Sequence, residues 1–167
     1  MRFLVLPFVL LLAACNPFAP GLDDSPDSST KLFSDQKTTD GVFQNLKYAY
    51  TLRDTSIYGQ LLDGNFTFVY HDYDRGVDVT WGREEEIRAT AGLFQNAQRL
   101  DILWNDVVSS SVDSTNTKAM VKRGFNLTVT FNPGDIVYVD GYANLTLQRA
   151  QPDDRWMIIR WNDESNY

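Results

Sequence analysis

Beyond about residue 40, apolar positions recur first at helical spacing and then at alternate positions. The helical spacing predicts a helix that begins with Asp40 as its N-cap and a second, short helix that begins with Asp54 and that Asp63-Gly64 would close. A third helix is predicted over residues 83–96, with three glutamates in its first turn, where they favour the positive end of the helix dipole. The positions expected to face the core are Val42, Phe43, Leu46, Ala49 and Tyr50, then Ile57, Tyr58, Leu61 and Leu62, then Ile87, Ala91, Leu93 and Phe94.

Alternation of apolar and polar residues predicts the strands. A first strand carries Phe66, Phe68 and Tyr70 and precedes the third helix, and four more cover residues 100–105, 125–131, 136–148 and 156–163. Residues 107–118, rich in Ser, Asp and Thr, are predicted as a loop or an extended hairpin tip. The order indicates an α+β fold, in which N-terminal helices pack on a curved antiparallel sheet in one domain over residues 40–167.

The first residues have the form of an export signal. Met1-Arg2 gives a positive start, and the apolar core from Phe3 to Leu12 is shorter than the roughly 20 residues of a membrane-spanning helix. The segment ends in Leu12-Ala13-Ala14-Cys15, which resembles the lipobox of bacterial lipoproteins. The resemblance implies a signal peptide over residues 1–14, cleavage before Cys15, and acyl chains (palmitate among them) on that residue as a membrane anchor.

Cys15 is the chain's one cysteine, so it has no disulfide partner, and the alternative is a secretory signal with an incidental cysteine. Asn16 follows it, whereas an aspartate at this position often retains a lipoprotein at the inner membrane. The resemblance therefore implies the outer membrane, facing the periplasm. Residues 15–39, rich in Ser, Pro and Asp, are predicted as a disordered tether with a reach of roughly 25–30 Å, the alternative being a strand docked on the domain.

Charge and composition narrow the classes of partner. The formal net charge is −7 and no basic cluster is present, which argues against nucleic acid as a partner. The sequence contains one histidine and no Gly-rich phosphate loop, and no metal or cofactor is predicted.

Three segments carry a family resemblance: "NLKYAYTLRDTSIYGQLLDGNFTF" (45–68), "WGREEEIRATAGLF" (81–94) and "RWMIIRWND" (155–163). With the order of elements, they resemble the nuclear transport factor 2-like superfamily, over about residues 40–163. The resemblance implies a sheet that bends around a long helix and leaves a conical pocket. The resemblance indicates the fold more than it indicates an activity.

The long strand over residues 136–148 contains a further indication of a pocket. Gly141 and Ala143 put small side chains in the middle of its apolar face, where either a pocket opens or a bulge lets the sheet bend. The aromatic residues that are candidates for lining such a pocket, each of which is otherwise plain core, are Tyr50, Tyr58, Tyr70, Trp104 and Trp161.

No catalytic set is predicted. Enzymes of the superfamily, such as ketosteroid isomerases and scytalone dehydratases, place acidic residues, histidines or tyrosines inside the cone, but no matching motif positions identify that set here. His71 with Asp72 is a candidate acid–base pair, although adjacent strand residues point to opposite faces and a solvated strand end is favoured. Asp101 and Asp140 alternate with core residues and are expected to point outward.

The last strand is apolar on both faces. Trp156, Ile158 and Arg160 are predicted on its outer face, opposite Met157, Ile159 and Trp161, which suggests a homodimer through the sheet. The leading hypothesis is a lipid-anchored, non-catalytic envelope domain that binds a small apolar ligand or a protein partner. The alternatives are an isomerase or dehydratase acting on a hydrophobic substrate in the cone, and a structural module acting through the sheet face. A carboxylate or His71 facing the cavity would favour the enzyme.

Overall fold

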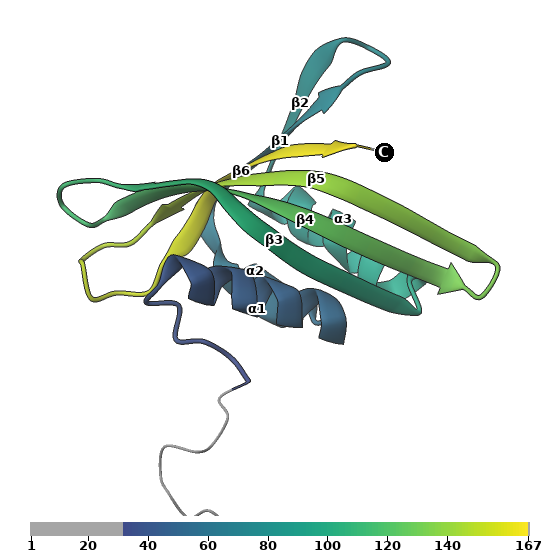
Figure 1. Cartoon of the computed structure of the whole chain (residues 1–167), viewed down its shortest axis with the longest axis horizontal. Coiled ribbons are helices and arrows are strands. Elements are labelled where there is room, and N and C mark those ends of the chain that lie inside the picture. The colour runs from purple at the N-terminus through teal and green to yellow at the C-terminus, as the bar shows by residue number, and fades with distance from the viewer. Residues whose placement is uncertain (1–31, 167) are drawn as a thin grey trace, which may run out of the picture. The chain divides into compact units, whose positions relative to one another are not determined.

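The computed structural model describes residues 32–166 (Figure 1). The predicted signal peptide, Cys15 and most of the predicted tether lie outside the described residues. Residues 34–38 are bound to the domain: Asn45 accepts from the Ser34 N–H at 2.8 Å and donates to the Ser34 carbonyl at 3.0 Å, and Gln36 is only 7% exposed. The domain therefore extends further toward the N-terminus than residue 40.

Three helices lie on one side of the sheet (Figure 1). They are α1 (Thr39–Leu52), α2 (Thr55–Leu61) and α3 (Arg83–Asn96). Asp54 caps α2 as predicted, because its carboxylate accepts from the Ser56 and Ile57 N–H groups. The predicted cap of α1 was wrong: Thr38 caps the helix by accepting from the Gly41 N–H, and Asp40 lies in its first turn.

The sheet has six strands in the order β2-β1-β6-β5-β4-β3. Their bounds are β1 (Leu62–Asp72), β2 (Val77–Gly82), β3 (Arg99–Val112), β4 (Lys118–Asn132), β5 (Asp135–Gln148) and β6 (Met157–Asn166). Four neighbouring pairs are antiparallel, and β1 pairs with β6 in parallel. The α+β fold class is confirmed, with a mixed sheet rather than a wholly antiparallel one, because the first and last strands of the sheet in chain order lie side by side and run parallel.

Two segments differ from the sequence-based prediction, and a third decides between two predicted alternatives. Asp63 and Gly64 do not end α2 but lie within β1. Residues 77–82, for which no strand was predicted, form β2 and pair with β1 from Thr67↔Gly82 to Asp72↔Val77. The β3–β4 hairpin extends to Val112 and Lys118, so residues 107–118 form the extended hairpin tip that was one of the two alternatives.

A β-bulge in β6 corrects the predicted faces of that strand. Ile158 pairs with Leu147 and Arg160 with Thr146, so Ile159 has no partner of its own and the inward–outward alternation changes phase there. Ile158 is fully buried and Trp161 is buried as well, although they are three positions apart, an odd spacing that in a regular strand would put them on opposite faces. Trp156, also predicted on the outer face, is in the core, where the Arg149 guanidinium lies 4.1 Å from its ring centroid. Only Arg160 of these candidates is exposed on the outer face.

Candidate functional site

A cavity of about 370 Å³ lies between α1, α3 and the inner face of the sheet. Its walls are mostly apolar, and its acidic and hydroxyl groups include those of Tyr50 from α1, Glu86 and Thr90 from α3, and Asp163 and Ser165 from β6. The residues that line it are Tyr50, Phe68, Tyr70, Trp81, Glu86, Ala89, Thr90, Leu93, Ile102, Phe125, Leu127, Val129, Val139, Trp161, Asp163 and Ser165.

The face that α3 buries carries a carboxylate. Its buried residues are Glu86, Thr90 and Phe94, one helical turn apart, and Glu86 is only 5% exposed. Oε1 of Glu86 accepts from the Tyr58 hydroxyl at 2.5 Å and from the Thr90 hydroxyl at 3.0 Å, while Oε2 accepts from the Trp81 indole N–H at 2.6 Å. Three neutral donors thus hold a buried carboxylate in one position, as burial of such a group requires.

A second carboxylate, Asp163 of β6, lines the same cavity. Its Oδ2 accepts from the Ser165 hydroxyl at 2.7 Å. Burial raises the pKa of Asp163 above its ordinary value, the hydrogen bonds from Ser165 oppose this, and the negative charges of Glu86 and Glu164 add to the increase. Asp163 is therefore easier to protonate than an ordinary aspartate.

Tyr50 of α1 stands close to both carboxylates. Burial raises the pKa of its hydroxyl, and the charges of Glu86 and Asp163 raise it further. The Tyr58 hydroxyl donates to Glu86, whereas the Tyr50 hydroxyl has no hydrogen-bond partner among the described residues. A hydroxyl that stays protonated and faces a cavity is available as a hydrogen-bond donor to a bound molecule.

Aromatic rings form one wall of the cavity. The rings of Phe68 and Trp81 stack with centroids 4.8 Å apart, the rings of Tyr70 and Trp81 lie 5.3 Å apart, and the rings of Phe68 and Trp161 lie 6.0 Å apart. Trp161 is 6% exposed, and within the described chain its Nε1 has no hydrogen-bond partner. The protein itself therefore leaves one buried donor of this wall unsatisfied.

The structure brings together three of the predicted pocket residues, Tyr50, Tyr70 and Trp161. Tyr58 is fully buried behind the cavity, where it supports Glu86. Trp104 lies elsewhere: it packs edge-on against Phe43 and donates its N–H to the Phe43 carbonyl at 2.9 Å.

Gly141 and Ala143 do not line the cavity, which opens beside Val139 instead. A Cβ on Gly141 would lie 2.4 Å from Cα of Ser165, so this glycine lets β5 and β6 approach closely, and its pairing with β4 and β6 continues without a register shift. Ala143 is fully buried. The small residues of β5 thus serve strand packing rather than the cavity.

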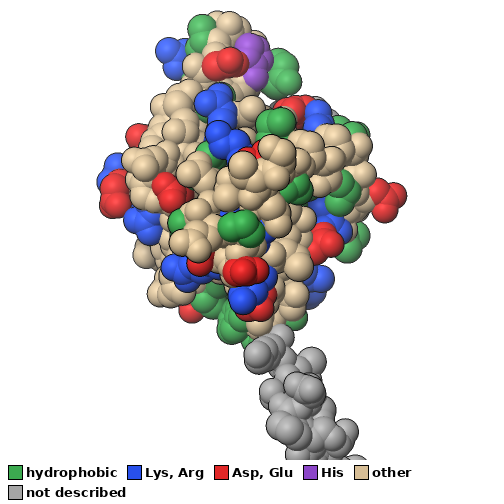
Figure 2. Space-filling view, turned by 90° about the vertical axis from the view of Figure 1, so that its left-hand side faces the viewer, with side chains coloured by type: hydrophobic (Ala, Val, Ile, Leu, Met, Phe, Trp, Pro, Cys, Tyr) green, Lys and Arg blue, Asp and Glu red, His purple; other side chains and the backbone are tan. Residues whose placement is uncertain are grey.

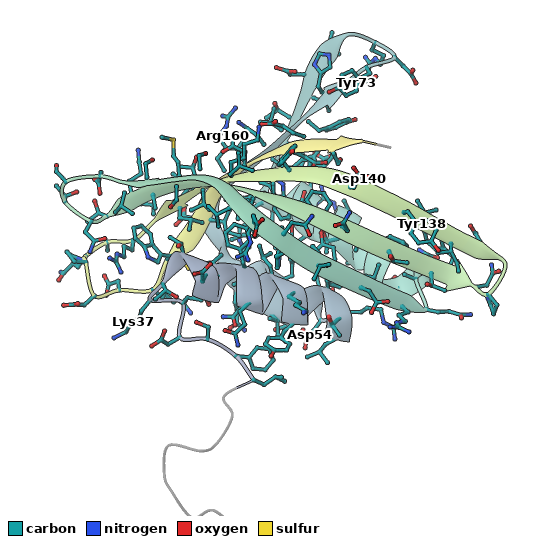
Figure 3. The ribbon with its side chains drawn as sticks, in the orientation of Figure 1. Lys37, Asp54, Tyr73, Tyr138, Asp140 and Arg160 are labelled. Carbon is teal, nitrogen blue, oxygen red and sulfur yellow. The ribbon has the colours of Figure 1, made fainter. Side chains whose placement is uncertain are left out.

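The other candidate chemistry lies outside the cavity. His71 pairs with Asp78 across the β1–β2 hairpin, with 2.8 Å between Nδ1 and Oδ1, rather than with Asp72, and it lies at the surface (Figure 2). Asp140 projects from the side of the sheet away from the helices (Figure 3), and Asp101 pairs at the surface with Arg99. Within residues 32–166, no three His, Cys, Asp or Glu side chains are grouped as a metal site would require.

The two carboxylates of the cavity were not among the predicted site residues. Glu86 was assigned to the helix dipole with Glu84 and Glu85, although its spacing to Thr90 and Phe94 places it on the buried stripe. Asp163 stands two residues after Trp161, which was itself predicted to face inward. Both signals were present in the sequence, but a carboxylate is normally assigned to a solvated position.

Comparison with known proteins supplies the fold. No family model and no curated protein sequence matches the chain. Several solved structures superpose on it. A conserved protein from Planctomyces limnophilus is 15% identical, with 76% of this chain and 92% of that chain covered and a TM-score of 0.65. A putative scytalone dehydratase from Novosphingobium aromaticivorans is 12% identical (77% and 81% covered, TM-score 0.64), and a putative dehydratase of the NTF2-like family from Streptomyces avermitilis is 18% identical (77% and 94% covered, TM-score 0.60). The chain has the nuclear transport factor 2-like fold.

At these identities, the likeness fixes the NTF2-like architecture and not the chemistry. Two of the three neighbours carry the name of a dehydratase, while the third is described only as a conserved protein. The cavity described above lies on the concave side of the NTF2-like sheet, so its own residues must decide what this chain binds.

Proposed function

We propose that this protein is a lipid-anchored envelope protein whose NTF2-like cone binds a small, mostly apolar molecule, with the polar group of that molecule at Asp163 and Glu86. The observation that carries the proposal is an apolar cavity of about 370 Å³ with two carboxylates in its wall. This volume falls in the range of small-molecule sites, which are mostly apolar and have a few polar groups that fix orientation.

The polar groups are arranged for a ligand rather than for the fold alone. Glu86 is held by three donors, but among the described residues the Tyr50 hydroxyl has no hydrogen-bond partner, and Asp163 is hydrogen-bonded only by Ser165, two residues along its own strand. Leaving polar groups unpaired in an apolar site costs roughly 1–3 kcal/mol each unless water or a ligand satisfies them. A bound molecule with a hydrogen-bonding end would fill this requirement.

Acid–base catalysis on such a molecule is the second candidate. It is favoured by Asp163, whose raised pKa makes it a stronger base than an ordinary aspartate, with Tyr50 nearby as a hydrogen-bond donor. The names of the dehydratase neighbours agree with this candidate. Molecules extracted from the purified protein would be identified by mass spectrometry and then incubated with wild type and with Asp163→Asn. Conversion by wild type alone supports catalysis, and binding without conversion supports a binding protein.

A blocked cavity tests the binding proposal directly. Ala89 lines the cavity yet is exposed on α3, so Ala89→Trp should fill the entrance without disturbing the core. Binding of the neutral fluorophore N-phenyl-1-naphthylamine should weaken by at least about tenfold, which corresponds to 1.4 kcal/mol. Gln95→Trp, also neutral and exposed on α3 but outside the cavity lining, is the matched control. Equal binding by wild type and both variants would contradict the proposal.

The anchor needs a separate test. No helix among the described residues is both long and apolar enough to cross a membrane. If Cys15 carries the lipid, Cys15→Ser should abolish labelling with radioactive palmitate and move the protein from the membrane fraction to the soluble fraction. Membrane attachment that persists in Cys15→Ser would refute the anchor while leaving the cavity proposal untouched.

A further inference from the structure

The cavity has a charge that the protein does not balance. Glu86 and Asp163 both line it, and in the described part of the chain no Lys, Arg or His lines it and no ion pair includes either carboxylate. The six ion pairs of the described residues lie elsewhere. Buried carboxylates are normally paired with a positive charge or neutralised by a proton, because an unpaired ion is poorly solvated in an apolar site.

The aromatic wall favours the same kind of charge. Ring faces are negative, so a cation within about 6 Å of a ring centroid is attracted to it, most strongly by Trp. Phe68, Tyr70, Trp81 and Trp161 lie next to one another in this wall, with neighbouring centroids 4.8–6.0 Å apart. Rings and carboxylates are independent features of one cavity, and both attract a cation and repel an anion.

The carboxylates also interact with each other. The charge of Glu86 contributes to the raised pKa of Asp163 and to that of Tyr50, so the negative potential reaches all three groups. A positive group placed among them would remove this repulsion and replace the missing counter-ion. A neutral apolar ligand would leave the repulsion in place, and an anion would increase it.

We infer that the ligand of this cavity is an organic cation, a protonated amine with an apolar body, whose positive group lies between Asp163, Glu86 and the wall formed by Phe68, Tyr70, Trp81 and Trp161. The inference rests on the proposed function, since it names the class of molecule that the same cavity takes. The apolar body would lie against the aliphatic part of the lining, which includes Leu127, Val129 and Val139.

Three probes of matched shape test the inference. Phenyltrimethylammonium and tert-butylbenzene differ only in a nitrogen that carries the positive charge, and benzenesulfonate places a negative charge at the same end. Binding would be followed by quenching of tryptophan fluorescence, since Trp81 and Trp161 line the cavity. The cation should bind at least about tenfold more tightly than its neutral isostere, and the sulfonate should bind most weakly.

Removing one charge should abolish this preference. Asp163→Asn keeps an oxygen that can accept from Ser165, so the fold is expected to tolerate it. The affinity of Asp163→Asn for phenyltrimethylammonium should fall to within about threefold of its affinity for tert-butylbenzene. Its affinity for tert-butylbenzene should equal or exceed that of wild type. Asp140→Asn removes the same formal charge from the outer face of the sheet and should keep the wild-type preference (Figure 3).

The outcomes separate this inference from the proposal on which it rests. Neutral and cationic probes that bind equally well, or a sulfonate that binds best, would overturn the cation and leave a binding cavity. If Asp163→Asn retains the preference for the cationic probe and Asp140→Asn loses it, the cation binds outside the cavity, and the inference is likewise overturned. If neither the three probes nor N-phenyl-1-naphthylamine binds, and Ala89→Trp changes nothing, the binding cavity itself is refuted.

Discussion

The inner face of the sheet is filled at one end and hollow at the other. On β5, Ala143, Leu145 and Leu147 are fully buried, whereas Val139 is half-buried at the cavity and Val137 is 40% exposed. All five alternate with outward residues along one strand, so the strand pattern does not distinguish the two ends. The difference must come from what the helices place opposite them.

The helices present different side chains to the two ends. The buried stripe of α1 includes Val42, Phe43 and Leu46, which join the packed core, whereas the buried stripe of α3 includes Glu86 and Thr90. The Glu86 carboxylate accepts from three donors, so this part of α3 presents hydrogen-bonded polar groups instead of the aliphatic side chains of the filled end. The hollow end is thus lined by the polar residues Glu86 and Thr90 of α3, whereas the filled end packs against apolar residues of α1.

The largest loss of stability is expected when Glu86 loses one of its hydrogen-bond donors. Tyr58→Phe removes the 2.5 Å hydrogen bond to Glu86 and leaves a buried carboxylate one donor short, which should lower the free energy of unfolding by about 2–3 kcal/mol. Tyr50→Phe removes a hydroxyl that has no such bond and should cost less than about 0.5 kcal/mol. Urea denaturation followed by circular dichroism measures both. Equal costs would mean that Glu86 does not depend on Tyr58.

The helices and long strands could be predicted because apolar periodicity persists along them. Strand β2 was missed because it has only three apolar positions, Val77, Val79 and Trp81, none of which is buried in the core. It is held by pairing with β1 rather than by a buried face of its own. Pairing between distant segments leaves little trace in a local pattern.

The site was predicted in part, and the errors have two physical causes. The rotation of about 100° per residue along α3 sends only one of three consecutive glutamates inward, and composition alone treats Glu84, Glu85 and Glu86 alike. The bulge at Ile159 changes the phase of β6, so alternation counted across it puts Trp156 and Ile158 on the wrong face. Counted forward from Trp161 alone, the same alternation places Asp163 in the cavity.

Two valines on β4, one at each end of the sheet, should differ by a smaller change in stability. Val121 pairs with Leu145 in the packed end, Val129 lines the cavity, and both are buried. Val121→Ala should lower the free energy of unfolding by about 2 kcal/mol, because two methyl groups are lost and a void is left. Val129→Ala should cost about 1 kcal/mol, because its side chain already faces empty space and loses fewer contacts. Similar values in urea denaturation would show that the two ends are packed alike.

The smallest effect concerns the charge of Asp163 and depends on pH. A carboxyl group with a raised pKa in the folded state binds its proton more tightly there than in the unfolded chain, so its ionisation destabilises the fold as pH rises through that pKa. The groups that act on Asp163 are Glu86 from α3, Tyr50 from α1, and Glu164 and Ser165 from its own strand. Of these, Ser165 favours the charged form and Glu86 opposes it.

Asp163→Asn has no carboxyl group to ionise at this position. It should therefore be more stable than wild type only at a pH at which Asp163 of wild type is ionised. Its Tm should match that of wild type at about pH 3, below the ordinary pKa of an aspartate, and exceed it at pH 7. Asp140→Asn changes the net charge by the same amount at the exposed face and measures that effect alone. Should Asp163→Asn instead lower the Tm at pH 7, the carboxylate would be stabilised by its surroundings in the empty protein. The hollow end of the sheet would then be balanced without a cation, and the difference between the two ends would be one of packing only.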